Sequence, residues 1–129
     1  MKDVFIVEAV RTAIGNFGGA FTGTGAVDLG AAVVKALLER TKVGAAEVDE
    51  IVLGCVLQAG LGQNVARQVL VKAGLPIERT ALTVNMVCGS GPRSVAAAGQ
   101  AVKAEDACLG MAGGNEHMPK APELTKQGG

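Results

Sequence analysis

One cysteine of this sequence has surroundings that suit a nucleophile. Cys88 follows the apolar run 81–87 and precedes a run of helix-forming residues, with Gly89 and Gly91 directly behind it. A thiol at the first turn of a helix faces unpaired N–H groups and the positive end of the helix dipole, and both favour the thiolate. The glycines allow a sharp reversal and leave room for a substrate near the backbone. This pattern predicts acyl transfer through a thioester on Cys88, whose own N–H can donate to the developing oxyanion.

Two other interpretations of the same residues stay open at this point. Free cysteines are often small buried hydrophobes, so Cys88 can also be a packing residue. The stretch GSGPRS at 89–94 nearly matches the glycine fingerprint of dinucleotide-binding domains, with Ser94 in place of the third glycine and Asp106 as the first acidic residue at a comparable distance. Alkylation at Cys88 would favour the thiol hypothesis, whereas binding of a nicotinamide or flavin would favour a dinucleotide site.

Composition excludes several classes of function. The 129 residues suggest one domain, and 12 basic residues balance 12 acidic ones, which leaves no basic footprint for nucleic acid. The only aromatic residues are three phenylalanines, so a base-stacking platform is not expected either. The start resembles no signal peptide and no apolar run is long enough to span a bilayer, so we expect a cytoplasmic protein without a membrane partner.

The remaining cysteines and the single histidine are expected to have structural and not catalytic roles. Three cysteines are too few, and an odd number, for a disulfide framework, and their spacing matches no zinc motif, so no metal and no cofactor is predicted. Cys55 and Cys108 fall in predicted strands and are interpreted as packing residues. His117 follows the last predicted strand on the side of Cys88; a base is one hypothesis, and an isolated solvated histidine is the commoner case.

Strand and helix patterns alternate along the chain. Apolar and β-branched runs predict strands, and apolar spacing between capping residues and glycines predicts helices, the first of them capped by Asp28. The predicted strands are 4–10, 50–57, 81–87 and 107–112, and the predicted helices are 28–37, 64–73 and 91–102. This order predicts an α/β domain over residues 1–114, a βαβαβαβ unit with a mostly parallel sheet covered by helices, followed by a polar loop region at 115–129. Ligands bind such sheets at the carboxyl ends of the strands, where Cys88 falls.

Four stretches resemble the thiolase family of acetyl-CoA acetyltransferases, in the family's order and over nearly the whole chain. They are IVEAVRTAIGNFGGAF at 6–21, VDEIVLGCVLQAGLGQNVARQ at 48–68, VNMVCGSGPRSVAAAGQAV at 84–102 and AGGNEHMPKAP at 112–122. The resemblance implies a thiolase-like N-terminal half and a role in fatty acid metabolism. It implies that Cys88 is the catalytic residue that attacks an acyl-CoA, releases CoA and holds the acyl group. A second acetyl-CoA then takes up that group, and the reverse reaction cleaves a 3-ketoacyl-CoA.

The resemblance also implies that much of a thiolase is missing here. Thiolases are several times longer, and their activating histidine, second cysteine and asparagine belong to a C-terminal half. A further strand follows the loop region that begins near residue 115, so 1–114 is expected to be an incomplete domain. We therefore expect an N-terminal fragment, inactive alone, of a protein that forms homo-oligomers at full length, with acetyl-CoA and CoA as substrates and no separate cofactor. The alternative is a non-catalytic folding or interaction fragment that needs a C-terminal half.

Two local features can be checked against the structure: a polar stretch that matches the family and a proline that departs from it. Gln63, Asn64 and Arg67 match a family stretch near the dimer contact and the site, although helix capping and a surface arginine explain them equally well. Pro92 replaces the bulky apolar residue usual after CGSG, and its missing N–H is tolerated in the first turn of a helix.

Overall fold

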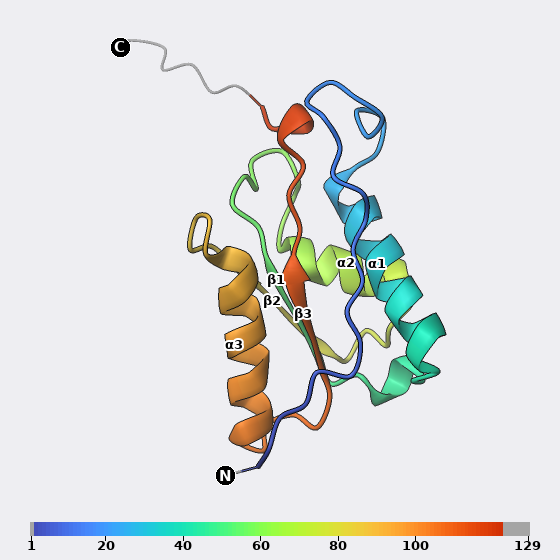
Figure 1. The fold of residues 1–129 in the computed structure, drawn as a ribbon, viewed down its shortest axis with the longest axis vertical. Coiled ribbons are helices and arrows are strands. Elements are labelled where there is room, and N and C mark those ends of the chain that lie inside the picture. Colours follow the sequence, from blue (N-terminus) through green and yellow to red (C-terminus); the bar gives the residue numbers. More distant parts are fainter. Residues whose placement is uncertain (1, 123–129) are drawn as a thin grey trace.

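The computed structural model describes residues 2–122, which form a parallel sheet between helices (Figure 1). The elements are α1 (Ala26–Thr41), β1 (Glu50–Gly54), α2 (Val65–Ala73), β2 (Thr80–Val84), α3 (Ser90–Lys103) and β3 (Gly110–Gly114), with short 3-10 helices at Ala45–Glu47 and Met118–Lys120. The last part of the loop predicted at 115–129, residues 123–129, lies outside the described residues. No helix in the described range is both long and apolar enough to cross a membrane.

The sheet has the strand order β2-β1-β3, and both pairings are parallel. The connection from β1 to β2 and the connection from β2 to β3 run in opposite directions across the sheet. Right-handed crossovers therefore place α2 and α3 on opposite faces, as Figure 1 shows. The helix α1 packs beside α2. The predicted α/β class, a parallel sheet with covering helices, is confirmed.

The core lies between β1, α2 and α1. Ile51 of β1, Val65, Val69 and Leu70 of α2, and Val34 of α1 are all buried. Because β1 is the central strand and is covered by helices on both faces, four of its five residues are buried, as its continuous apolar character predicted.

The capping residues predicted from the sequence mark both ends of α2 correctly, but they misplace the start of α1. The Asn64 side chain accepts a hydrogen bond from Arg67 N at 3.1 Å, and Gly74 ends α2 with a φ of 87°. Helix α1 begins earlier than predicted, with Gly25 at the N-cap. Asp28 is therefore not the cap; it is the third helical residue, and its carboxylate accepts from Gly25 N at 3.2 Å.

The strand predicted at residues 4–10 is wrong: this segment is extended but pairs with no strand among the described residues. Within the described part of the chain, residues 2–14 make only local hydrogen bonds, such as the one from Ala9 N to the carboxylate of Glu8 at 2.8 Å. Phe5, Ile6 and Val7 are 80%, 79% and 72% exposed. The segment has the composition of a buried strand, but a strand needs a partner that supplies the ladder.

The last strand begins three residues later than predicted because of a distant carboxylate. Asp49, directly before β1, accepts hydrogen bonds from Cys108 N at 2.7 Å and Leu109 N at 3.1 Å. These two bonds and the nearby Arg79 guanidinium hold the pKa of Asp49 below its usual value. The backbone N–H groups just before Gly110 therefore donate to a side chain and not to a neighbouring strand. Cys108 lies outside β3 and is exposed. Its interpretation as a buried strand residue is wrong.

Candidate functional site

Cys88 lies at the carboxyl end of the sheet, between β2 and α3. The loop after β1 leads to α2 on one face, and the loop after β2 leads to α3 on the other, which is where parallel sheets of this kind bind ligands. Gly89 is the N-cap of α3 and Ser90 its first residue, so Cys88 immediately precedes the cap. Because Cys88 is exposed, it is not a core packing residue, and its thiol is accessible to a substrate.

The chain reverses before Cys88 in a way that the glycines did not predict. The residue with positive φ is Val87, at 50°, whereas Gly89 has a φ of −85°. A Cβ on Gly89 would lie 2.6 Å from Cε of Met86, the flexible end of an exposed side chain, and 3.3 Å from Met86 O, so the space there is tight but does not strictly require glycine. Pro92 is the third residue of α3, inside the first turn, where its missing N–H is tolerated as expected.

The backbone at the N-terminal end of α3 contacts β1 directly. A Cβ on Gly54, the last residue of β1, would lie 2.5 Å from the carbonyl carbon of Ser90 and 2.7 Å from its Cβ. Only glycine allows this close approach. The start of the helix that follows Cys88 is therefore fixed against the central strand.

The other two cysteines differ sharply from each other. Cys55 directly follows β1 and is completely buried, as predicted for a packing residue. Burial, with a smaller contribution from the nearby Glu116 charge, raises the pKa of its thiol to about 11. Cys108 is exposed but lies beyond the opposite, amino-terminal end of β3.

His117 is buried between two loops and is not the isolated solvated histidine that the sequence suggested. It is only 7% exposed, and its Nε2 lies 2.8 Å from the carbonyl oxygen of Phe21, which ties the loop after β3 to the loop before α1. Its Nδ1 is buried without a hydrogen-bond partner among the described residues. No cluster of metal-ligating side chains occurs in residues 2–122.

Sequence reasoning missed the role of Glu116. Its carboxylate accepts hydrogen bonds from Val56 N and Leu57 N, both at 2.9 Å. It thus joins the loop after β3 to the loop after β1. Only the position of an acidic residue just beyond a strand end hinted at this contact, because the partners lie about sixty residues earlier in the chain.

Asn64 and Arg67 have structural roles within this chain. Asn64 caps α2 and also donates to Ala81 O at 3.0 Å, while the Arg67 guanidinium donates to Arg79 O at 2.8 Å. These bonds join α2 to β2 and to the turn before it. Gln63 is exposed, and its carbonyl accepts from the Gln68 side chain at 2.8 Å.

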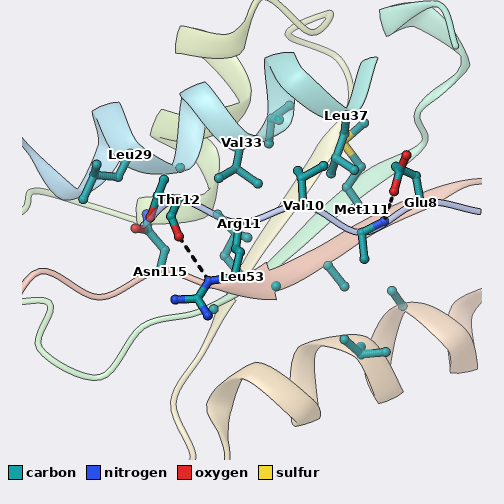
Figure 2. A pocket seen from close by; sticks show the side chains of 18 of the residues that line it. Glu8, Val10, Arg11, Thr12, Leu29, Val33, Leu37, Leu53, Met111 and Asn115 are labelled. Carbon is teal, nitrogen blue, oxygen red and sulfur yellow. Dashed lines mark hydrogen bonds between the residues drawn. The ribbon is translucent and has the colours of Figure 1, made fainter. Parts of the chain in front are cut away.

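A large apolar cavity lies away from Cys88, on the outer side of β3. Its volume is about 1020 Å³, and residues 3–17, α1, α3 and β3 all contribute to its lining, which does not include Cys88. Figure 2 shows Leu29, Val33 and Leu37 of α1 beside the segment that carries Val10 and Arg11. The outer edge of β3 has no strand partner in the described part of the chain.

Fold and site together define an α/β domain that presents an exposed thiol between a parallel strand and a helix start. The chain belongs to the thiolase family, since residues 4–128 match the model of the thiolase N-terminal domain. It is 56% identical to an acetyl-CoA acetyltransferase of Escherichia coli, over 96% of this chain and 32% of the relative. An acetyl-CoA acetyltransferase of Syntrophomonas wolfei is 52% identical over 94% of this chain and 31% of the relative.

A solved structure agrees with this assignment. The Acat5 thiolase from Ascaris suum, in complex with coenzyme A, matches with a TM-score of 0.95 and 37% identity, over 99% of this chain and 34% of that one. The present chain spans about a third of the length of these proteins.

The three cysteines are expected to react with iodoacetamide at different rates in the folded protein at pH 8. Cys88 reacts fastest because it is exposed beside the start of α3, and the exposed Cys108 follows. Cys55 stays unlabelled because it is buried and its thiol, with a pKa of about 11, is protonated at this pH. Peptide mass spectrometry over time measures the three rates, and unfolding in urea is the control that should equalise them. Labelling of Cys88 no faster than Cys108 in the folded chain would contradict activation by the helix start.

Proposed function

We propose that this chain supplies the nucleophile of an acetyl-CoA C-acetyltransferase and acts together with a C-terminal part. The observation that carries the proposal is the exposed Cys88 at the turn between β2 and α3, in a chain about half identical to acetyl-CoA acetyltransferases. Cys88 matches the cysteine of the family motif CGSG that carries the acyl group. Its position at a strand end beside a helix start suits a thiolate nucleophile.

The proposed reaction begins with attack of the Cys88 thiolate on the thioester carbonyl of an acyl-CoA. The tetrahedral intermediate collapses to an acyl-cysteine thioester, and CoA leaves as its thiolate and takes up a proton. A second acetyl-CoA loses a proton from its methyl group, and the resulting carbanion attacks the acyl-cysteine, which releases a 3-ketoacyl-CoA and regenerates the Cys88 thiolate. Run backwards, the same steps cleave a 3-ketoacyl-CoA with CoA.

The second half of this reaction needs a base, and the histidine and the other two cysteines of this chain have structural positions that do not mark them for that role. His117 is the single histidine of the sequence, and its Nε2 is engaged at Phe21 O. Cys55 is buried and Cys108 lies at the other end of the sheet. The groups that move protons in the condensation are therefore proposed to come from a C-terminal part, and this chain alone is expected to be inactive.

The cavity beside β3 supports a second candidate function, a folding or interaction fragment that needs a C-terminal half. One more strand placed between residues 4–10 and β3 would give a hydrogen-bonding partner to the outer edge of β3 and to the extended segment 4–10. A five-residue strand about 17 Å long, with strand and sheet spacings near 4.8 Å and 10 Å, occupies roughly 800 Å³. The cavity of about 1020 Å³ has room for such a strand. This observation favours assembly with further polypeptide, whether or not the assembled protein is catalytic.

Co-expression tests both functions. The chain is produced alone and together with the C-terminal two-thirds of one of the acetyl-CoA acetyltransferases, and acetoacetyl-CoA cleavage is followed in the presence of CoA. We expect no turnover by either part and steady turnover by the co-purified complex. A stable complex without turnover would favour the interaction fragment. Steady turnover by the purified chain alone would overturn the need for a C-terminal part.

A further inference from the structure

The residue before Cys88 has a backbone conformation that its side chain disfavours. Val87 has a φ of 50°, in the left-handed region, where a β-branched residue is an outlier. Such conformations persist only where the surrounding structure holds them in place, and they concentrate at functional sites. The contacts of Val87 therefore show what fixes the turn that carries Cys88.

Two side chains hold the backbone of Val87 from both sides. Asn85 Oδ1 accepts a hydrogen bond from Val87 N at 3.0 Å, and Ser90 Oγ donates to Val87 O at 2.6 Å. Ser90 Oγ also accepts from Met86 N at 2.8 Å. Ser90 is buried at the start of α3, so its hydrogen bonds join the turn to the helix. Asn85 instead bonds to a different loop.

Asn85 connects this turn to the loop after β1. Its Nδ2 donates to Val56 O at 3.3 Å, and the N–H groups of Val56 and Leu57 are in turn held by the Glu116 carboxylate. The Asn85 side chain thus accepts a hydrogen bond from the strained turn and donates one to the loop after β1, which Glu116 in the loop after β3 also holds. No other side chain in the described residues bonds to both Val87 and the loop after β1.

We propose that Asn85 is a positioning residue for the Cys88 nucleophile, acting by holding Val87 in its left-handed conformation. Asn85 acts through the backbone and needs no contact with the substrate. The inference rests on the proposed function of Cys88, because the conformation matters to catalysis only if this thiol is the nucleophile. It adds that a neutral side chain three residues before the thiol sets the rate at which the thiol reacts.

The test is the ratio of the iodoacetamide labelling rates of Cys88 and Cys108 within one molecule. N85A is expected to lower this ratio about five- to tenfold, because the thiol loses its fixed place beside the helix start. N64A is the matched control: it removes an asparagine with hydrogen bonds to Arg67 N and Ala81 O, but none to the Cys88 turn. N64A should weaken the fold and leave the ratio unchanged.

A second substitution separates positioning from general destabilisation. Glycine adopts positive φ readily, so V87G in the N85A background should restore at least half of the lost ratio on a logarithmic scale. An unchanged ratio in N85A, an equal fall in N64A, or no recovery with V87G would each overturn the role of Asn85. If Cys88 reacts no faster than Cys108 in the unsubstituted protein, the activation of Cys88 fails as well. A high ratio there that N85A leaves intact refutes only the positioning role.

Discussion

C88S is expected to lower acetoacetyl-CoA cleavage by on the order of 10⁴-fold in the complex of this chain with a C-terminal part. A serine hydroxyl at the same place stays protonated and is a weak nucleophile without a dedicated base. Steady-state cleavage of acetoacetyl-CoA with CoA measures the effect, and size-exclusion chromatography checks that the complex still forms. Since the residue is exposed, little change in stability is expected from the substitution itself.

C108S is the matched control for this experiment. Cys108 is also exposed, but it lies before β3 at the other end of the sheet, and its backbone N–H, not its thiol, is held by Asp49. Activity in C108S should stay within about twofold of the unsubstituted complex, a difference of less than 0.5 kcal/mol in barrier. A large loss in C108S together with an active C88S would reverse the assignment of the nucleophile.

G54A is expected to reduce the free energy of unfolding of this chain by about 3 kcal/mol, at the upper end of overpacking effects. The new Cβ would meet the carbonyl carbon, carbonyl oxygen and Cβ of Ser90 at 2.5–2.7 Å. Backbone atoms cannot rotate away as a side chain does, so the start of α3 must move from β1. Urea unfolding followed by circular dichroism gives the change, provided that the slope with urea is unchanged.

G113A makes the same substitution in the adjacent strand. Gly113 pairs with Leu53, and the nearest heavy atom to a Cβ there is Leu53 Cδ2 at 3.9 Å, an ordinary contact. Its unfolding free energy should stay within about 0.5 kcal/mol of the unsubstituted chain. Equal losses in the two variants would show that glycine is needed for reasons other than the contact of Gly54 with Ser90.

Features decided by neighbouring residues were predictable from the sequence. The ends of α2 were predicted because Asn64 and Gly74 act on backbone groups within one turn. The parallel sheet followed from the alternation of strands and helices, and the place of Cys88 followed from its position between a strand and a helix, although β1 and β2 each end three residues earlier than predicted, at Gly54 and Val84.

Features decided by distant residues were not predictable in this way. The carboxylate of Asp49 shifts the start of β3, and the carbonyl of Phe21 keeps His117 out of solvent. A glycine in a strand signals a close neighbour, but only the structure identifies Ser90 as the neighbour of Gly54. Val87 was missed because β-branched residues avoid positive φ, so the pattern assigned the reversal to the adjacent glycines.

The outer edge of β3, which has no strand partner among residues 2–122, affects the risk of aggregation while this polypeptide is being synthesised. An edge that has no strand partner within residues 2–122, near the exposed Phe5 and Ile6, is a template for strand exchange with other nascent chains. Ribosomes add about 5–20 residues per second, so each hundred residues of the proposed C-terminal part, if made on the same chain, would leave the edge bare for roughly 5–20 s. Holding chaperones have that interval in which to bind, and heat stress is the condition under which newly made molecules should aggregate first.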